Sequence, residues 1–152
     1  MSVGTISVGA MSARLVGTWL LVSQESINAD GRRTPSRGEG AAGILMYDGA
    51  GNMAVQLMRT DAHAAEYTDL NSLETAMRGF LAYYGRYDVD ETQQVIRHHV
   101  IGASYFGYRG TIQVRRYSLI GDMLTLQAAS ASDDTTRVLI WRRVATASLD
   151  VY

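Results

Sequence analysis

Short apolar segments alternate with turn-forming residues along most of this chain, and the alternation points to a protein built from consecutive β-strands. Asp48-Gly49-Ala50-Gly51-Asn52 separates two such segments, residues 43–47 and 53–59. Gly and Asn accept positive φ at little cost, so this motif favours a tight hairpin between antiparallel strands. The same pattern predicts further strands at residues 15–25, 83–89, 95–101, 111–120, 123–129 and 137–144.

One segment between the third and fourth predicted strands departs from this pattern. Asn71 followed by Glu74 has the spacing of a helix-capping box. Apolar side chains then recur at helical spacing, at Leu73, Met77, Phe80, Leu81 and Tyr84. We therefore expect an all-β fold, an eight-stranded antiparallel up-and-down barrel with one α-helix, Ser72 to Tyr83, inserted between strands 3 and 4. A barrel of this size can hold one small ligand inside.

Length and composition indicate a single globular domain and exclude several kinds of site. The 152 residues are 47% hydrophobic and 19% charged, so we expect one domain, residues 1–152, with a barrel core at 15–144 and terminal extensions at 1–12 and 145–152. A net charge of -1 weakens the case for nucleic-acid binding, which favours a basic face. The absence of cysteine excludes disulfides, thiolate metal sites and cysteine nucleophiles.

The chain also lacks the apolar segments that a membrane protein or a secreted precursor would carry. No apolar run approaches the roughly 18 residues of a membrane-spanning helix. No Lys or Arg precedes Arg14, so the N-terminus lacks the basic region of a secretory signal. We expect no membrane partner and a cytoplasmic location, with Met1 or Met11 as the true start.

Six sequence blocks, taken in order, resemble those of a known family. They are Leu15-Val16-Gly17-Thr18-Trp19, Met53 to Arg59, Phe80 to Asp90, Arg97 to Val100, Gln113 to Tyr117 and Leu139 to Val144. Through these blocks the chain resembles the lipocalin-like domain family, small bacterial and fungal calycin-type barrels. The resemblance implies a barrel with a cavity, without specifying a ligand or a reaction. It also implies that Trp19 packs under an arginine of the last strand, for which Arg143 is the natural partner.

The strand over residues 113–119 is expected to place polar groups inside the barrel. Gln113 and Arg115 share their parity with the apolar residues Tyr117 and Leu119, and alternate side chains of a strand lie on one face. A buried charge is costly unless it is paired. Two interpretations stay open for Arg115: it anchors a carboxylate, enolate or carbonyl oxygen of a ligand, or it forms a structural salt bridge with an acidic residue.

The adjacent histidines are expected to lie on opposite faces of their strand. His98 shares the more apolar face with Ile96 and Val100 and is the inward candidate, whereas His99 lies with Arg97 on the outer face. The two histidines cannot chelate one metal together, and we expect no metal and no cofactor. His98 is then either a hydrogen-bonded core histidine or a group that contacts a ligand or exchanges protons with it.

The remaining candidates come from two other predicted strands. Tyr83 and Tyr87 share a face, and buried tyrosine hydroxyls need hydrogen-bonding partners. Gln56 differs in parity from Val55 and Leu57 and could point either way. We therefore predict a ligand-binding set and two catalytic candidates. The ligand-binding residues are Gln56, Tyr83, Tyr87, Gln113, Arg115 and Tyr117, and the catalytic candidates are His98 and Arg115.

Three functional hypotheses follow. The first is a barrel that binds a small, largely apolar, oxygen-bearing molecule. The alternative is a cofactor-independent isomerase or cyclase acting on a polyketide- or terpenoid-like intermediate, since a barrel can hold a reactive conformer and polarise a carbonyl. The third is a non-catalytic interaction protein, and a homodimer is compatible with all three. The expected partner is a small-molecule ligand or substrate and not nucleic acid.

Overall fold

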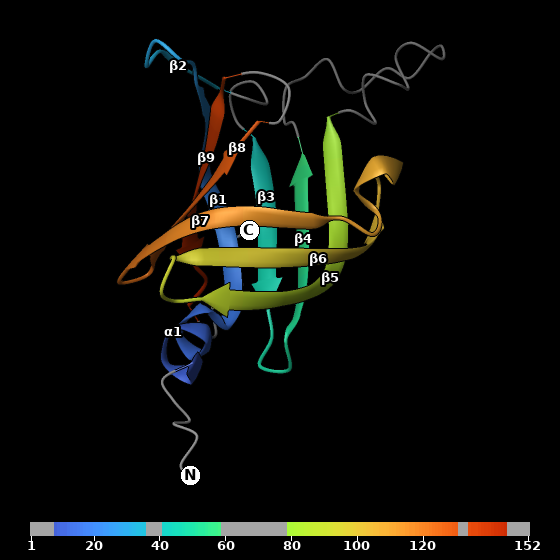
Figure 1. The fold of residues 1–152 in the computed structure, drawn as a ribbon. Coiled ribbons are helices and arrows are strands. Elements are labelled where there is room, and N and C mark those ends of the chain that lie inside the picture. Colours follow the sequence, from blue (N-terminus) through green and yellow to red (C-terminus); the bar gives the residue numbers. More distant parts are fainter. Residues whose placement is uncertain (1–7, 36–40, 59–78, 131–133, 146–152) are drawn as a thin grey trace.

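The computed structural model of this chain describes residues 8–35, 41–58, 79–130 and 134–145. Helix α1 (Val8–Leu15) precedes strand β1 (Gly17–Ile27) and the short strand β2 (Arg33–Pro35). Two hairpin strands, β3 (Ala42–Tyr47) and β4 (Asn52–Met58), follow. The remaining elements are β5 (Phe80–Asp90), β6 (Val95–Ala103), the 3-10 helix η2 (Phe106–Tyr108), β7 (Ile112–Ile120), β8 (Met123–Ala129) and β9 (Thr136–Arg143) (Figure 1).

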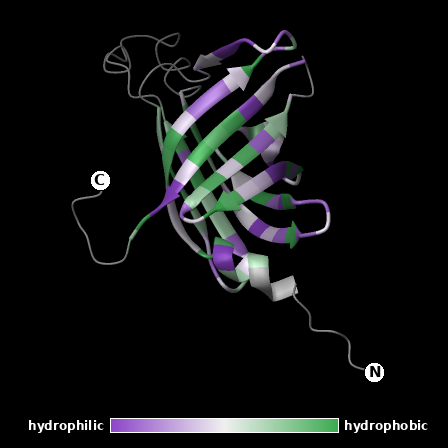
Figure 2. Cartoon of the chain, turned by 90° about the vertical axis from the view of Figure 1, so that its left-hand side faces the viewer, coloured by the Kyte–Doolittle hydropathy of each residue, from purple (hydrophilic) through white to green (hydrophobic). Residues whose placement is uncertain are grey.

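The strands form one closed antiparallel barrel. Each strand from β3 to β9 pairs with the next, β3 also pairs with β1, and β1 pairs with β9, so eight strands complete the ring. The three-residue β2 pairs only with the end of β1, where Ile27 lies opposite Arg33. The predicted eight-stranded antiparallel barrel is confirmed, and colouring by hydropathy shows hydrophobic and hydrophilic residues alternating along its strands (Figure 2).

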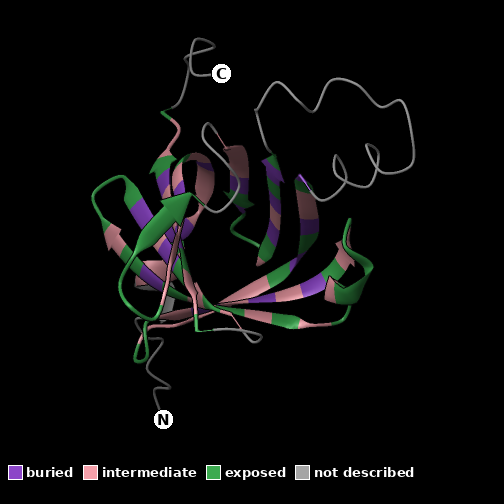
Figure 3. Cartoon of the chain, turned by 90° about the horizontal axis from the view of Figure 1, so that it is seen from above, coloured by how far each residue is buried: buried purple, intermediate pink, exposed green. Residues whose placement is uncertain are grey.

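Strand β5 bends sharply and links two groups of strands that cross (Figure 1). A β-bulge between Tyr84 and Gly85 marks the bend in its pairing with β6. A Cβ at Gly85 would lie 1.9 Å from the carbonyl oxygen of His99, so the close approach of the two backbones requires glycine at this position. The bend allows the strands to curve around one interior, and the buried residues line its inner surface (Figure 3).

Helix α1 covers one end of the barrel, at the lower side of Figure 1. Leu15 is fully buried and Met11 packs against the core. The backbone N–H of Met11 donates a hydrogen bond to Glu91 Oε1 at 2.8 Å. The prediction that placed Leu15 in the first strand was wrong, because Leu15 ends α1 and β1 begins at Gly17. The apolar side of this short helix is buried because it covers the open end of the barrel.

The prediction of a helix between strands 3 and 4 was wrong for the residues that the structure describes. Residues 72–78 of the predicted helix lie outside the described residues. Phe80 to Tyr83 belong to β5, where Phe80 lies opposite Met58 and Tyr83 lies opposite Val55. Leu81 and Tyr83 fit an alternating pattern as well as a helical one, and pairing with β4 decides between the two patterns.

The predicted contact between Trp19 and Arg143 is confirmed near the covered end of the barrel. The two residues are directly opposed on β1 and β9, and the guanidinium carbon lies 4.3 Å from the centre of the fully buried Trp19 ring. Trp19 Nε1 donates to the Leu15 carbonyl at 3.0 Å. Arg143 donates to the carbonyls of Val16, at 2.7 Å, and Arg14. This arginine therefore joins helix α1 to the barrel wall.

Candidate functional site

A cavity of about 380 Å³ lies inside the barrel and reaches the β8–β9 turn, where Ala128, Ala129 and Arg137 line it. Leucines and a valine supply much of its wall: Leu45, Val55, Leu57, Leu81, Leu126 and Leu139. Polar and aromatic side chains are interspersed among them, namely Gln24, Tyr83, His98, Tyr108, Gln113, Arg115, Arg137 and Trp141. The described part of the wall therefore contains two arginines and no carboxylate.

His98 lies in this wall between two tyrosines. The ring is almost fully buried, with an exposed fraction of 1%. Its Nε2 lies 2.6 Å from the Tyr47 hydroxyl, and its Nδ1 lies 2.8 Å from the Tyr83 hydroxyl. Strand pairing sets this arrangement, because β3, β5 and β6 each contribute one member with its side chain on the inner face. The prediction that His98 points inward and His99 outward is confirmed.

Burial determines the protonation states of these three groups. Desolvation, reinforced by the positive charge of Arg115, lowers the pKa of His98 from 6.5 to about 3. Desolvation also raises the pKa of Tyr47 well above 10.0 and raises that of Tyr83. At neutral pH the ring is therefore uncharged and both phenols keep their protons. A neutral imidazole has one N–H donor and one acceptor nitrogen.

These protonation states leave one hydroxyl proton for the cavity. Tyr47 is buried outside the cavity wall, and within the described chain His98 Nε2 is the acceptor for its hydroxyl. When Tyr47 donates to Nε2, His98 carries its proton on Nδ1 and donates it to the Tyr83 oxygen. Tyr83 lines the cavity, so its own O–H is available there as a hydrogen-bond donor.

Arg115 extends from β7 into the same wall, next to Gln113. Its Nη1 donates to the Val114 carbonyl at 3.0 Å, and its Nη2 donates to Gln113 Oε1 at 3.4 Å. Gln113 Nε2 in turn donates to Thr111 Oγ1 at 2.8 Å. The charge of Arg115 opposes the rise in the pKa of the Tyr83 hydroxyl, which places the guanidinium close to that hydroxyl. No carboxylate of the described residues forms an ion pair with Arg115.

Three of the predicted ligand-binding residues lie away from the cavity. Gln56 is exposed on the outer face of β4, because Val55 and Leu57 take the inner face. Tyr87 lies nearer the α1 end, where its hydroxyl donates to the Asp48 carbonyl at 2.8 Å. Tyr117 is buried but does not line the cavity, and its backbone N–H donates to the Gln94 carbonyl at 3.0 Å, in the turn between β5 and β6. Correct parity does not show how far along the barrel axis a side chain lies.

The sequence predictions missed four polar or aromatic residues of the wall: Gln24, Tyr108, Arg137 and Trp141. Gln24 was missed because a β-bulge between Leu21 and Ser23 shifts the alternation that starts at Trp19. Beyond the bulge Gln24 points inward. Trp141 shared its parity with Leu139 in the sequence, a signal that could have identified it as an inward residue.

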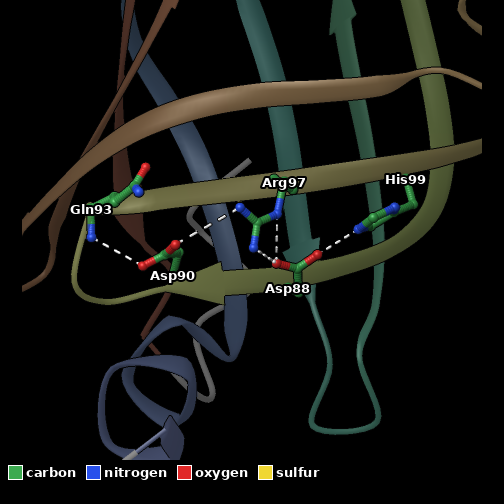
Figure 4. Close-up of polar contacts among 5 residues, drawn as sticks. All are labelled: Asp88, Asp90, Gln93, Arg97 and His99. Atoms are coloured by element: carbon green, nitrogen blue, oxygen red, sulfur yellow. Dashed lines mark hydrogen bonds and ion pairs between the residues drawn. The ribbon is translucent and has the colours of Figure 1, made fainter.

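A network of charged groups lies on the outer side of the barrel, on β5 and β6 (Figure 4). Arg97 Nη2 lies 2.7 Å from Asp88 Oδ1, and His99 Nε2 lies 2.5 Å from Asp88 Oδ2. Partial burial favours a higher pKa for Asp88, but the hydrogen bonds from His99 and Arg97 have the larger effect. The pKa of Asp88 is therefore lower than its ordinary value. Asp90 accepts a hydrogen bond from the Gln93 backbone at 3.0 Å. These contacts support the β5–β6 turn and do not reach the cavity.

The described residues carry neither a metal-binding cluster nor a membrane-spanning helix. Those residues contain no group of three or more His, Cys, Asp or Glu side chains placed to hold a metal ion. Within the same ranges, no helix has both the length and the apolar character needed to cross a membrane. The cytoplasmic location stays a prediction.

The fold and the site together define an all-β barrel with an internal cavity of mixed apolar and polar lining. A family model described as the lipocalin-like domain matches residues 16–144. The chain belongs to the lipocalin-like domain family.

Among solved structures, the fold is similar to that of fatty-acid-binding protein 1 from Echinococcus granulosus. The two share 13% sequence identity with a TM-score of 0.43, over 88% of this chain and 99% of that chain. A search of curated proteins found no match.

Proposed function

We propose that the barrel binds a small, largely apolar, oxygen-bearing ligand in its cavity, with Arg115 as the anchor for the oxygen. The observation that carries this proposal is the half-buried guanidinium of Arg115 in a wall of mixed apolar and polar lining, where the described residues supply no carboxylate partner. An unpaired charge in such a setting costs free energy. A carboxylate or carbonyl oxygen of the ligand would offset that cost through charge-assisted hydrogen bonds.

Tyr83 supplies a second donor for the same oxygen. Its hydroxyl accepts from neutral His98 and directs its own proton toward the cavity, close to Arg115. His98 acts in this proposal as a positioning residue, because its two hydrogen bonds fix the orientation of Tyr83. Gln113 supports Arg115 in the same way through its amide oxygen.

The alternative function, a cofactor-independent isomerase or cyclase, would require His98 to exchange a proton near neutral pH if His98 is its acid–base group. A histidine with a pKa of about 3 is a weak base at that pH, and efficient acid–base groups have a pKa near the working pH. Both ring nitrogens also engage tyrosine hydroxyls. These properties favour binding over proton transfer as the role of this group.

Replacing Arg115 with methionine tests the proposed anchor. Arg115→Met keeps much of the side-chain volume and removes the charge, so it should weaken the binding of decanoic acid by about 1.5–3 kcal/mol, the value of a charged hydrogen bond. Isothermal titration calorimetry measures this difference. Arg116→Met is the matched control, because Arg116 is exposed on the outer face of the same strand. Equal affinity of both variants and the unmodified protein would show that Arg115 has a structural role only.

We also propose a homodimer that forms through the outer face of β6 and β7. Ile101, Ile112 and Val114 are more than half exposed there, and large exposed apolar patches mark interaction sites. The neighbouring Arg97, His99 and Asp88 mix both signs of charge, so this face does not repel a copy of itself. Light scattering after size exclusion should give twice the monomer mass, and Val114→Glu should shift it to that of the monomer. A monomeric unmodified protein at high concentration would disprove this assembly.

A further inference from the structure

Two buried polar atoms of the cavity wall lack partners within the described chain. They are the amide oxygen of Gln24, a residue that is 7% exposed, and the indole Nε1 of Trp141, which is 1% exposed. Both residues line the cavity. A buried polar group without a hydrogen bond costs about 1–3 kcal/mol, and nearly all such groups in native proteins have a partner.

The other tryptophan of the chain shows that the fold can satisfy a buried indole. Trp19 Nε1 donates to the Leu15 carbonyl at 3.0 Å. Trp141 is buried to nearly the same extent, yet no described residue accepts its proton. Gln24 reaches the interior only because of the β-bulge between Leu21 and Ser23. Bulges commonly redirect a side chain next to a functional site.

The two unpartnered atoms lie in the same part of the wall. Gln24 lies opposite Leu139 in the pairing of β1 with β9, and Trp141 follows Leu139 by two residues on the same face. Residues in such diagonal positions have backbones about 7–8 Å apart, within reach of long and aromatic side chains. The two residues therefore line one part of the cavity from adjacent strands, and each has one unpartnered buried atom, an acceptor on Gln24 and a donor on Trp141.

The chemistry of this pair selects the group that can satisfy both members. Gln24 Oε1 needs a donor and Trp141 Nε1–H needs an acceptor. A carboxylate or ketone only accepts and an ammonium only donates, whereas a hydroxyl does both through one oxygen atom.

The position of the pair distinguishes it from the proposed anchor. In the ring of strands, β1 and β9 lie across the barrel from β5 and β6, which carry Tyr83 and His98, whereas β7, which carries Arg115, is separated from β9 by β8. We infer that Gln24 and Trp141 form a second polar subsite that binds a hydroxyl group, so that the ligand places an acceptor oxygen at Arg115 and Tyr83 and a hydroxyl at the part of the wall formed by β1 and β9. This inference rests on the proposed function and narrows its ligand to hydroxylated molecules of hydroxy-acid or hydroxy-ketone type.

Matched pairs of probes test the inference. Straight-chain fatty acids of 8, 10 and 12 carbons are compared with their ω-hydroxy derivatives by calorimetry. For the chain length that fits, the hydroxyl should increase affinity about threefold to tenfold, as expected for one or two neutral hydrogen bonds. Gln24→Leu and Trp141→Phe should each reduce this gain to less than about twofold while the parent acid still binds. Gln127→Leu, at an exposed position on β8, is the matched control and should keep the full gain.

A spectroscopic readout reports on the same contact directly. The chain has two tryptophans, so a ¹H–¹⁵N spectrum contains two indole N–H signals. The hydroxy acid should shift the Trp141 signal downfield, and the Trp19 signal, already hydrogen-bonded, should stay in place. The parent acid should not cause that downfield shift.

The outcomes separate this inference from the anchor proposal. If the hydroxyl brings no affinity at any chain length and the Trp141 signal does not move while the parent acids bind, the hydroxyl subsite is wrong and the anchor stands. In Arg115→Met the gain from the hydroxyl should persist although overall affinity falls. If neither kind of acid binds, the anchor and the subsite are both rejected.

Discussion

Trp19→Ala is expected to lower the free energy of unfolding by about 3–5 kcal/mol, the range for removing a fully buried aromatic side chain. Trp19 has no exposed surface, and the change leaves a cavity beneath Arg143. The variant also loses the cation–π contact, worth about 0.5–2 kcal/mol, and the hydrogen bond to Leu15. Urea denaturation followed by circular dichroism measures the difference.

Trp19→Phe provides the control for this prediction. It keeps an aromatic face under Arg143 and loses the N–H donor, so it should cost less than the alanine change. A loss below about 1 kcal/mol for Trp19→Ala would contradict the structure at this end of the barrel, because large losses are diagnostic of core cavities.

Acid should destabilise the protein through His98 well before its carboxylates are protonated. The pKa of His98 is about 3 in the folded protein and 6.5 when the residue is free of its surroundings, so the unfolded chain binds a proton that the folded protein excludes. Stability is therefore complete above pH 6.5 and falls as the pH is lowered toward about 3. At about pH 4.5 the loss should reach roughly 2–3 kcal/mol, since each pH unit corresponds to ~1.4 kcal/mol.

Urea denaturation of the protein and of His98→Gln, at about pH 7 and pH 4.5, measures this contribution. The glutamine amide can bond both tyrosines and does not titrate, so the variant should lose less stability between the two pH values. The pKa values of Asp48 and Asp88 are lowered from 3.8, so these two carboxylates change the stability mainly at lower pH. They contribute little to the difference between pH 7 and pH 4.5. Parallel pH profiles for the two proteins would show that His98 is not the group responsible.

Local patterns predicted the barrel because turn chemistry and alternation act over a few residues. The Asp48 to Asn52 turn joins β3 and β4, and Asp48 Oδ1 accepts hydrogen bonds from the backbones of Ala50 and Asn52. The opposite faces of His98 and His99 follow from alternation alone. The segment from Phe80 to Tyr83 fits two periods, and only its pairing with β4, which is distant in sequence, determines that it is a strand.

The site was less predictable because it depends on how far along the barrel axis each side chain lies. Alternation placed Tyr87 and Tyr117 on the inner side of the wall and could not show that both lie below the cavity, toward α1. The bulge that turns Gln24 inward is a backbone irregularity without a glycine or proline to mark it. Tyr47 was missed as a partner of His98 because no local pattern pairs residues that are 51 positions apart.

The pairing of β1 with β9 also affects how the chain can fold. It joins Trp19 to Arg143 across most of the sequence, so the ring closes only after all the intervening strands are available. Contacts of such long sequence separation slow folding, because the entropy of closing a large loop is lost before the contacts form. During synthesis the first strand emerges from the ribosome long before its final neighbour. Until then β1 has an unpaired edge, which is a site where chains aggregate.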